Sequence, residues 1–284
     1  MRIATWNVNS AKQRMPRLLP WLEERKPDVV CLQETKLTDA TFGELLAGPL
    51  AELGYEAAHH GYGGFNGVAL LSRVGLSAVE RDFPGQPRYG GVTEARAISA
   101  TCGGVRIHSL YVPNGREVGS DHYAYKLAWL DALAAATAGE EQVALCGDMN
   151  IAPADADVFD PASFLGHTHV TAEERGRIAA FGLVDVVRER WPQERVFSYW
   201  DYRAGMFHKD LGMRIDLVLT SRGVADRVAA AWVDRQARKG SGPSDHAPVI
   251  VDLDAAPDGD IGPVVPPPSN PVRRGRGVRL PQSP

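Results

Sequence analysis

The sequence has few cysteines, and they are poorly placed for disulfide bonds. Its 284 residues include three, Cys31, Cys102 and Cys146, which lie far apart in the chain. An odd number of widely spaced cysteines is a poor disulfide framework. We therefore expect the protein to work in a reducing compartment.

The sequence also has no excess of positive charge and no long hydrophobic run. It contains 31 Lys and Arg against 35 Asp and Glu, which gives a formal net charge of −4. No overall field would attract a nucleic acid or a membrane, so a polyanionic partner must be held locally. No stretch approaches the ~18 apolar residues of a membrane span. Residues 1–7 turn polar too early for a signal-peptide core, and we expect a cytoplasmic protein.

The composition changes once, near residue 255. Residues 255–284 contain repeated prolines and an arginine cluster with almost no periodic apolar pattern. Such a segment cannot repay the entropy lost on ordering. We predict one folded domain over residues 1–254 and a disordered Pro/Arg-rich tail over residues 255–284. That tail either forms a weak phosphate-binding arm or has no role.

Within residues 1–254, short apolar runs rich in β-branched residues alternate with helical patterns. The runs predict strands at 2–8, 28–33, 68–72, 95–101, 105–112, 142–146, 214–220 and 248–253, and the periodic segments predict helices at 16–26, 39–53, 121–138 and 172–181. Gly103-Gly104 is a hairpin signal, and Thr171 with Glu174 is a capping box. Because no strict βαβ repeat is present, sheets covered by helices are favoured over a Rossmann sheet.

Polar side chains with catalytic potential cluster where the predicted strands begin or end. Burying such groups unpaired costs several kcal/mol, so this placement is typical of a site at the rim of a sheet. The residues concerned are Asn7, Glu34, Asp148, Asn150, Asp216, Asp245 and His246.

These residues offer oxygen ligands and no thiolate, which suits Mg²⁺ or Mn²⁺ and argues against a structural zinc site. An acid left free by the metal could position or deprotonate an attacking water. His246, with Asp216 as an orienting carboxylate, could transfer a proton near neutral pH. Each motif alone also fits a turn or a cap. Their joint occurrence in one chain favours a metal-assisted phosphoester hydrolase.

The motifs that carry this chemistry run in a recognisable order. They include Trp6-Asn7-Val8-Asn9, Gln33-Glu34-Thr35-Lys36, Gly147-Asp148-Met149-Asn150, Gly182-Leu183-Val184-Asp185, Tyr199-Trp200-Asp201-Tyr202-Arg203 and Ser244-Asp245-His246-Ala247-Pro248. The set resembles the exonuclease III family of abasic-site endonucleases, within the wider endonuclease/exonuclease/phosphatase superfamily. The Asp-x-Asn and Ser-Asp-His elements mark only the superfamily, whereas the second, fourth and fifth motifs point to its DNA-repair branch.

The resemblance implies a four-layer α/β sandwich, in which two packed mixed β-sheets are flanked by helices as in DNase I-like proteins. It also implies that residues 1–254 form the catalytic domain of a Mg²⁺-dependent (or Mn²⁺-dependent) DNA repair nuclease. Such an enzyme cleaves the phosphodiester 5′ to abasic sites in duplex DNA, with 3′-to-5′ exonuclease and 3′-phosphatase activity. Its partner would be duplex DNA with abasic sites or blocked 3′ ends, and we expect a monomer.

The resemblance further implies a role for each site residue. The metal ligands would be Asn7, Glu34, Asp148, Asn150 and Asp245, with Glu34 as the principal one. Asp148 would also position or activate the attacking water.

Other residues would contact the substrate. Asn150, Tyr111 and Asn114 would hold the scissile phosphate, and His246, oriented by Asp216, would stabilise the charge that builds as the bond breaks. Tyr199 and Trp200 would pack against a flipped-out abasic sugar, although core packing is an equal explanation for one of that pair.

Two alternatives stay open. A related phosphoesterase could act on a small phosphorylated molecule or a lipid head group, and the motifs at residues 33–36 and 199–203 speak against it. A nucleic-acid-binding member of the superfamily could have kept the fold and lost the chemistry. The presence of all the expected ligands speaks against that.

Overall fold

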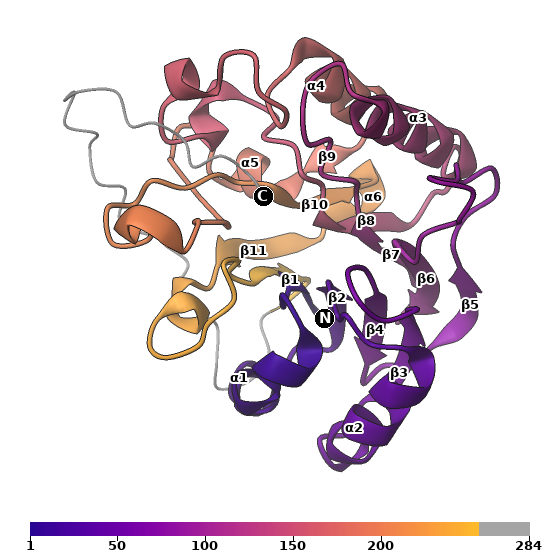
Figure 1. The fold of residues 1–284 in the computed structure, drawn as a ribbon. Coiled ribbons are helices and arrows are strands. Elements are labelled where there is room, and N and C mark those ends of the chain that lie inside the picture. Colours follow the sequence, from indigo (N-terminus) through magenta and orange to yellow (C-terminus); the bar gives the residue numbers. More distant parts are fainter. Residues whose placement is uncertain (256–284) are drawn as a thin grey trace.

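Two six-stranded β-sheets form the centre of the molecule in the computed structural model, which describes residues 1–255 (Figure 1). In the first sheet the strands lie in the order β11 (Val228–Val233), β12 (Val249–Leu253), β1 (Arg2–Asn7), β2 (Val29–Gln33), β4 (Val68–Ser72) and β3 (Glu56–His60). In the second the order is β5 (Ser77–Arg81), β6 (Ala97–Cys102), β7 (Val105–Tyr111), β8 (Val143–Asp148), β10 (Asp216–Thr220) and β9 (Val184–Asp185).

Helices cover the outer face of each sheet. Along β1, Ile3 packs into the apolar cluster between the sheets, whereas Ala4 points to the cluster beneath α1 (Ala11–Arg25) and α2 (Asp39–Glu52). The second sheet packs in the same way against α3 (Asp121–Ala136) and α4 (Ala172–Ala180). Figure 1 shows the four resulting layers, with α1 and α2 below the sheets and α3 and α4 above them. The predicted four-layer sandwich is therefore confirmed.

The remaining helical segments are short. They are α5 (Val186–Arg190), α6 (Arg222–Ala225) and the 3₁₀ turns Asp155–Asp157, Pro161–Phe164, Arg203–Gly205 and Arg235–Arg238.

All eight predicted strands are present, with ends displaced by at most two residues. The structure contains four further strands that were not predicted, β3, β5, β9 and β11. These four are the edge strands of the two sheets. Three helices begin at the predicted residue, but α1 begins at Ala11 instead of Pro16. The reason is that the Ser10 hydroxyl accepts a hydrogen bond from Gln13 N and caps the earlier turn.

Two local predictions are also confirmed. Gly103 and Gly104 form a two-residue turn between β6 and β7, with φ values of 54° and 83° that favour glycine. Thr171 and Glu174 make both hydrogen bonds of a capping box at the start of α4.

A fully buried ion pair ties together two strands of the first sheet. Arg2 of β1 lies opposite Asp252 of β12, and Arg2 Nε donates to Asp252 Oδ1 at 2.8 Å. The guanidinium also stacks on Trp232, 5.0 Å from the ring centroid. This pair lies at the end of β1 opposite Asn7.

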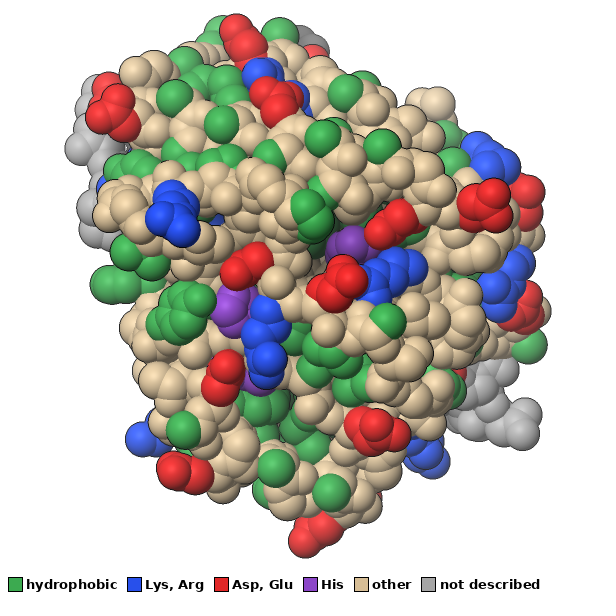
Figure 2. All heavy atoms as spheres, turned by 90° about the vertical axis from the view of Figure 1, so that its right-hand side faces the viewer, with side chains coloured by type: hydrophobic (Ala, Val, Ile, Leu, Met, Phe, Trp, Pro, Cys, Tyr) green, Lys and Arg blue, Asp and Glu red, His purple; other side chains and the backbone are tan. Residues whose placement is uncertain are grey.

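The face over β3 and β5 carries charges of both signs. In Figure 2 basic and acidic side chains lie next to one another on this face, so no patch of one sign forms there. Among residues 1–255, no helix is both long and apolar enough to cross a membrane. Cys31, Cys102 and Cys146 are buried free thiols. Residues 256–284, and with them nearly all of the predicted tail, lie outside the described residues.

Candidate active site

The topology of the first sheet brings two predicted site segments to one edge. β1 and β2 are parallel, and Asn7 at the end of β1 pairs with Gln33 at the end of β2. Glu34 therefore follows directly beside Asn7. β12 runs antiparallel to β1, with Val249 opposite Thr5, so the Asp245-His246 segment reaches the same edge.

The second sheet presents its own site residues at this edge. β7 and β8 are parallel and end with Tyr111 opposite Asp148. β10 is antiparallel to β8, and its first residue, Asp216, also lies opposite Asp148. Gly147 lets β7 and β8 approach each other, since a Cβ at that position would lie 1.9 Å from the Leu110 carbonyl oxygen.

One amide joins the two sheets at this edge. Asn7 Nδ2 donates to Glu34 Oε1 at 2.8 Å and to Asp148 Oδ2 at 3.0 Å. Asn9 N donates to Asn7 Oδ1, and Asn9 Nδ2 donates to Asp245 Oδ1 at 3.1 Å. Three carboxylates predicted as metal ligands thus surround one asparagine pair.

The segments that carry these residues are strained. Asn9, Glu34 and Asn150 have φ values of 43°, 51° and 50°, in the left-handed region that non-glycine residues seldom adopt. Each such residue costs about 1–3 kcal/mol and persists only where its surroundings fix it. Strain in three of the four predicted ligand segments is typical of a functional site.

His246 lies between two carboxylates. Its Nδ1 is 2.8 Å from Asp216 Oδ2, and its Nε2 is 3.8 Å from Asp148 Oδ2. The Ser198 hydroxyl donates to Asp216 Oδ2 at 2.6 Å and holds that carboxylate in place. Trp6 Nε1 donates to the His246 carbonyl oxygen at 3.1 Å.

Burial and neighbouring charges set the protonation of this pair. Burial alone would lower the pKa of His246, but Asp216 and Asp148 outweigh it and raise the pKa to about 10. Burial raises the pKa of Asp148 to about 7, with Asp216 and Glu34 adding to the effect against the pull of His246. For Glu34, burial is outweighed by Lys36 and Asn7, so its pKa is lowered and it is ionised at neutral pH.

The predicted phosphate-contacting residues lie beside Asp148. Asn150 N donates to Asp148 Oδ1 at 2.9 Å, and Asn114 Nδ2 donates to Asn150 Oδ1 at 3.1 Å. The Tyr111 ring lies under the Arg96 guanidinium at 4.8 Å. Burial and the charge of Glu34 raise the pKa of Tyr111 well above its usual value, so its hydroxyl stays a donor.

The structure separates the two predicted sugar-contacting aromatics. The Tyr199 ring is partly exposed and lies 4.9 Å from the His246 ring. Trp200 is 0% exposed, packs edge-on against Phe207 and donates from Nε1 to Asp210 Oδ1 at 3.2 Å. This burial argues against the predicted contact of Trp200 with a sugar. The alternative reading, core packing, describes its position.

A buried ammonium beneath the site was missed by sequence reasoning. Lys126 Nζ donates to the carbonyl oxygens of Asn150 (2.8 Å) and Asn114 (3.2 Å) and pairs with Glu174 at 2.5 Å. Both side chains of the pair are fully buried. The signal was a lysine on the apolar face of the helix over residues 121–138, three residues after Tyr123 and four before Leu130.

The donor set at the strand ends fits a hard divalent cation. Glu34, Asp148 and Asp245 present carboxylate oxygens, and no thiol lies among them. In this structure Asn7 turns its amide nitrogen toward Glu34 and Asp148, while its oxygen accepts from Asn9 N. Lys36 Nζ is 3.0 Å from Glu34 Oε2 and 2.6 Å from Asn9 Oδ1, so these oxygens already attract a positive charge. Asp148, Asp216 and His246 also place ligand atoms within 4.8 Å of one another.

The chain matches a family described as the endonuclease/exonuclease/phosphatase family over residues 4–246. Together with the sandwich and the strand-end site, this match defines a phosphodiester-cleaving enzyme of that class, as predicted.

Comparison with individual proteins shows to which branch of this superfamily the chain belongs. The chain is 30% identical to exodeoxyribonuclease III of Haemophilus influenzae, over 88% of this chain and 98% of the relative. An AP endonuclease structure from Archaeoglobus fulgidus superposes with a TM-score of 0.84 at 33% identity, over 90% of this chain and all of the other. The 3′ phosphatase NExo from Neisseria, bound to a product DNA hairpin, has the same TM-score and coverage at 35% identity. The chain belongs to the exonuclease III family, as its motifs predicted.

Proposed function

We propose that this protein is a Mg²⁺- or Mn²⁺-dependent nuclease that cleaves the phosphodiester 5′ to abasic sites in duplex DNA and leaves a 3′-hydroxyl. It also removes nucleotides and phosphates from 3′ ends. The observation that carries the proposal is the Asn7 amide bonded to both Glu34 and Asp148, with the His246–Asp216 pair on the far side of Asp148. The similarity to an AP endonuclease and to a 3′ phosphatase bound to DNA supports the choice of substrate.

Glu34 would be the principal metal ligand, with Asn7 and Asp245 beside it and Asp148 and Asn150 completing the set. A divalent ion bound there supplies positive charge that polarises the phosphate oxygens and offsets the charge of the transition state. The lowered pKa of Glu34 suits this role, because a carboxylate ligand must be ionised.

Asp148 would accept a proton from the attacking water. A pKa of about 7 matches this task, since a base works best when its pKa lies near the working pH. His246 would carry its charge at neutral pH, donate from Nδ1 to Asp216 and present Nε2–H to the phosphate. Ser198 positions Asp216 and so fixes the ring of His246.

Asn150, Asn114 and Tyr111 would donate hydrogen bonds to the phosphate. Asn150 Nδ2 uses one hydrogen on the Val112 carbonyl oxygen, which leaves the other for a ligand. Donors fixed in place before the reaction stabilise developing charge, each by about 3 kcal/mol.

Tyr199 would pack against the flipped-out abasic sugar, and Trp200 would support it from the core. A sugar without its base costs less to flip, which favours damaged over intact nucleotides. As further parts of this proposal, the enzyme acts as a monomer on duplex DNA in the cytoplasm, where its three buried thiols stay reduced.

The decisive substrates are three duplex oligonucleotides: one with a single tetrahydrofuran abasic analogue, one undamaged and one with a 3′-phosphate. Each is incubated with Mg²⁺ and with EDTA. We expect metal-dependent incision 5′ to the analogue. Processing of the 3′ ends alone would mean an exonuclease or 3′-phosphatase that accepts no flipped sugar. No cleavage of any duplex would point to a non-DNA phosphoester or to a binding protein.

A further inference from the structure

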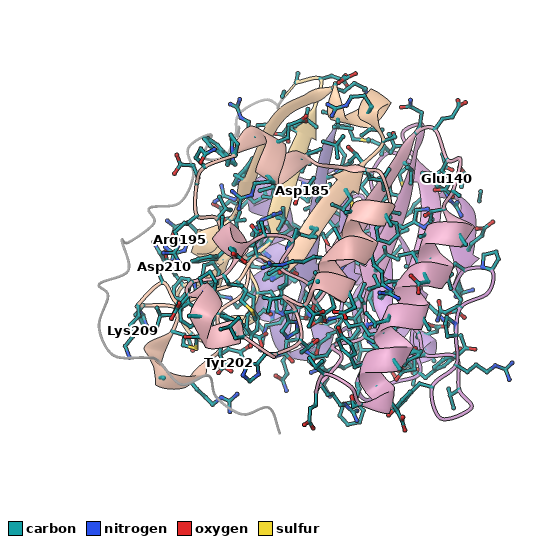
Figure 3. All side chains as sticks on the ribbon, turned by 90° about the horizontal axis from the view of Figure 1, so that it is seen from above. Glu140, Asp185, Arg195, Tyr202, Lys209 and Asp210 are labelled. Atoms are coloured by element: carbon teal, nitrogen blue, oxygen red, sulfur yellow. The ribbon has the colours of Figure 1, made fainter. Side chains whose placement is uncertain are left out.

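A second hollow lies outside the strand-end site. It is an open cavity of about 330 Å³ between the segment that follows Trp200 and the segment that precedes Ser244. Its lining includes Asp201, Tyr202, Phe207, His208, Arg238 and Lys239. We call it the Arg238 cavity. Figure 3 shows Tyr202, Lys209 and Asp210 together on the side of the molecule that carries it, opposite Glu140.

Arg238 is a buried cation that forms no ion pair within the described residues, although the charge of Asp245 acts on it from farther away. It is 7% exposed, and its guanidinium lies between the rings of Tyr202 (5.1 Å) and Phe207 (4.9 Å). Its one hydrogen bond within residues 1–255 is a long one, from Nη2 to the Trp200 carbonyl oxygen at 3.3 Å. Its Nε is buried without a partner. No carboxylate of the described chain lies within ion-pair distance of it.

Several other buried or half-buried cations among the described residues are neutralised. Arg2 pairs with Asp252 at 2.8 Å, and Arg214 pairs with Asp157 at 2.7 Å. Arg235, which also stacks on Phe207, pairs with Asp210 at 2.9 Å. The stacking of Arg238 alone therefore does not explain why it has no acid.

A second buried arginine adds to the positive charge here. Arg14 is buried, donates from Nη2 to the Tyr202 hydroxyl at 3.1 Å and has no carboxylate partner in the described part of the chain. Burial lowers the pKa of Arg238, and the charge of Arg14 adds to this effect, although Tyr202 and Asp245 act in the opposite direction. Two guanidinium groups thus share one tyrosine with no acid between them.

Asp201, the one carboxylate in the cavity lining, already accepts hydrogen bonds from Arg203. Asp201 Oδ2 accepts from Arg203 Nη2 at 2.9 Å, and Asp201 Oδ1 accepts from the Arg203 backbone N–H at 2.7 Å. Arg238, Lys239 and His208 are left to face the cavity. An unpaired buried charge is unfavourable unless a ligand neutralises it, so these groups favour an anion in the cavity.

The cavity is joined to the strand-end site through one short segment. The Tyr202 hydroxyl donates to the Pro243 carbonyl oxygen at 2.9 Å, and Pro243 directly precedes Ser244 and Asp245. At its other side, Asp201 follows two residues after Tyr199. A DNA strand whose scissile phosphate lies at His246 and whose sugar packs on Tyr199 would bring a neighbouring phosphate toward this wall.

We propose that the Arg238 cavity is a phosphate-binding subsite, distinct from the scissile position. Guanidinium groups favour phosphate because their parallel N–H donors match two of its oxygens. The phosphate belongs either to the backbone of the bound DNA strand, in which case the inference rests on the proposed function, or to a free phosphate compound.

The test compares Arg238→Gln with wild type and with Arg222→Gln, a matched loss of one positive charge at an exposed arginine on α6. Binding of an uncleaved tetrahydrofuran duplex is measured in EDTA at several salt concentrations. Each phosphate contact contributes about 0.9 to the slope of log K against log salt. We expect Arg238→Gln to lower this slope by about one contact and Arg222→Gln to leave it unchanged.

A second arm titrates inorganic phosphate into the same proteins in EDTA, followed by calorimetry. Binding of free phosphate that Arg238→Gln weakens at least tenfold, with an unchanged DNA slope, would identify a free phosphate compound as the ligand. The opposite pattern would identify the DNA backbone. If Arg238→Gln matched wild type in both arms, the proposal would be overturned.

A further variant guards against misfolding. Lys239 is exposed, so Lys239→Gln should fold normally, and we expect it to weaken the same binding about threefold. Wild-type behaviour of Lys239→Gln beside an unfolded Arg238→Gln would contradict the subsite. A wild-type protein that binds phosphate through Arg238 but cleaves no duplex would refute the proposed function and leave the subsite standing.

Discussion

The two ends of the central sheets are built differently. At one end, strands stop in polar residues with left-handed backbone, such as Glu34 and Asn150. At the other, β6 and β7 are joined by the two-glycine turn, and β1 and β12 are locked by the Arg2–Asp252 pair. One end carries polar groups that a ligand can use, and the other contributes stability. The fold therefore separates chemistry from stability along the length of its strands.

The largest effect should come from the catalytic end. We predict that Asp148→Asn and His246→Ala each lower turnover on the tetrahydrofuran duplex by at least ~100-fold, the usual scale for losing a catalytic base or an electrostatic stabiliser. DNA binding should stay largely intact. Single-turnover rates and binding constants measured side by side would check this, and near wild-type turnover in both variants would refute the assigned roles.

Two buried ion pairs allow a matched comparison of the ends. Removing one partner of such a pair costs about 3–5 kcal/mol, so Lys126→Met and Arg2→Met should lower the free energy of unfolding similarly. Only Lys126→Met should also reduce turnover per folded molecule, by about tenfold, because small displacements of positioning groups are costly. The reason is that Lys126 holds the carbonyl oxygens of Asn114 and Asn150.

The control for that comparison is the Lys126→Met/Asn114→Ala double variant. If Lys126 acts through Asn114, the two losses in turnover should not add. Equal turnover of Lys126→Met and Arg2→Met, once corrected for the folded fraction, would remove the distinction between the two ends.

The Lys126–Glu174 pair should also make stability depend on pH. Although burial alone would raise it, the pKa of Glu174 is lowered to about 2 by Lys126 and Thr168. Its carboxylate therefore stabilises the fold fully above its ordinary pKa of 4.5, and this contribution is lost as the pH falls toward 2. Urea unfolding should show a wild-type advantage over Glu174→Gln that is full at pH 7 and much smaller at pH 3. A gap that does not depend on pH would contradict this account.

The smallest effect is expected at the Gly103-Gly104 turn, at the end of the sheets opposite the site. Gly104 has a φ of 83°, and a Cβ there would meet no other atom within 4 Å. Gly104→Ala should therefore lower the free energy of unfolding only because alanine disfavours the left-handed backbone, by about 1–2 kcal/mol. Turnover should stay unchanged. Thermal unfolding and the incision assay check both parts, and a clear loss of turnover would mean that the far end is coupled to the site.

The inner strands could be predicted from the sequence, and the edge strands could not. Central strands such as β4 are buried on both faces and read as continuous apolar runs. β5 is exposed along its whole length, and β3 is half-exposed, so neither shows a strong apolar pattern. The same limit applies to β9, which has two residues.

The site divides in a similar way. Asn7, Glu34, Asp148 and His246 could be predicted to share one edge, because each stands at a strand end within a motif. The environment of Trp200 and the Lys126–Glu174 pair could not, because both depend on how segments pack in space. Trp200 is covered by the segment that follows it, and Lys126 on α3 meets Glu174 on α4. A motif identifies a residue, but only the fold decides whether its side chain faces the substrate or the core.

The most direct test of the central claim measures the initial rate of incision of the tetrahydrofuran duplex across a range of Mg²⁺ concentrations, for wild type and Glu34→Gln. The account predicts no incision in EDTA, Mg²⁺-dependent incision by wild type, and a requirement for at least tenfold more Mg²⁺ in the variant. Incision without metal, or the same Mg²⁺ dependence in both proteins, would contradict the claim that these strand ends form a metal-dependent nuclease site.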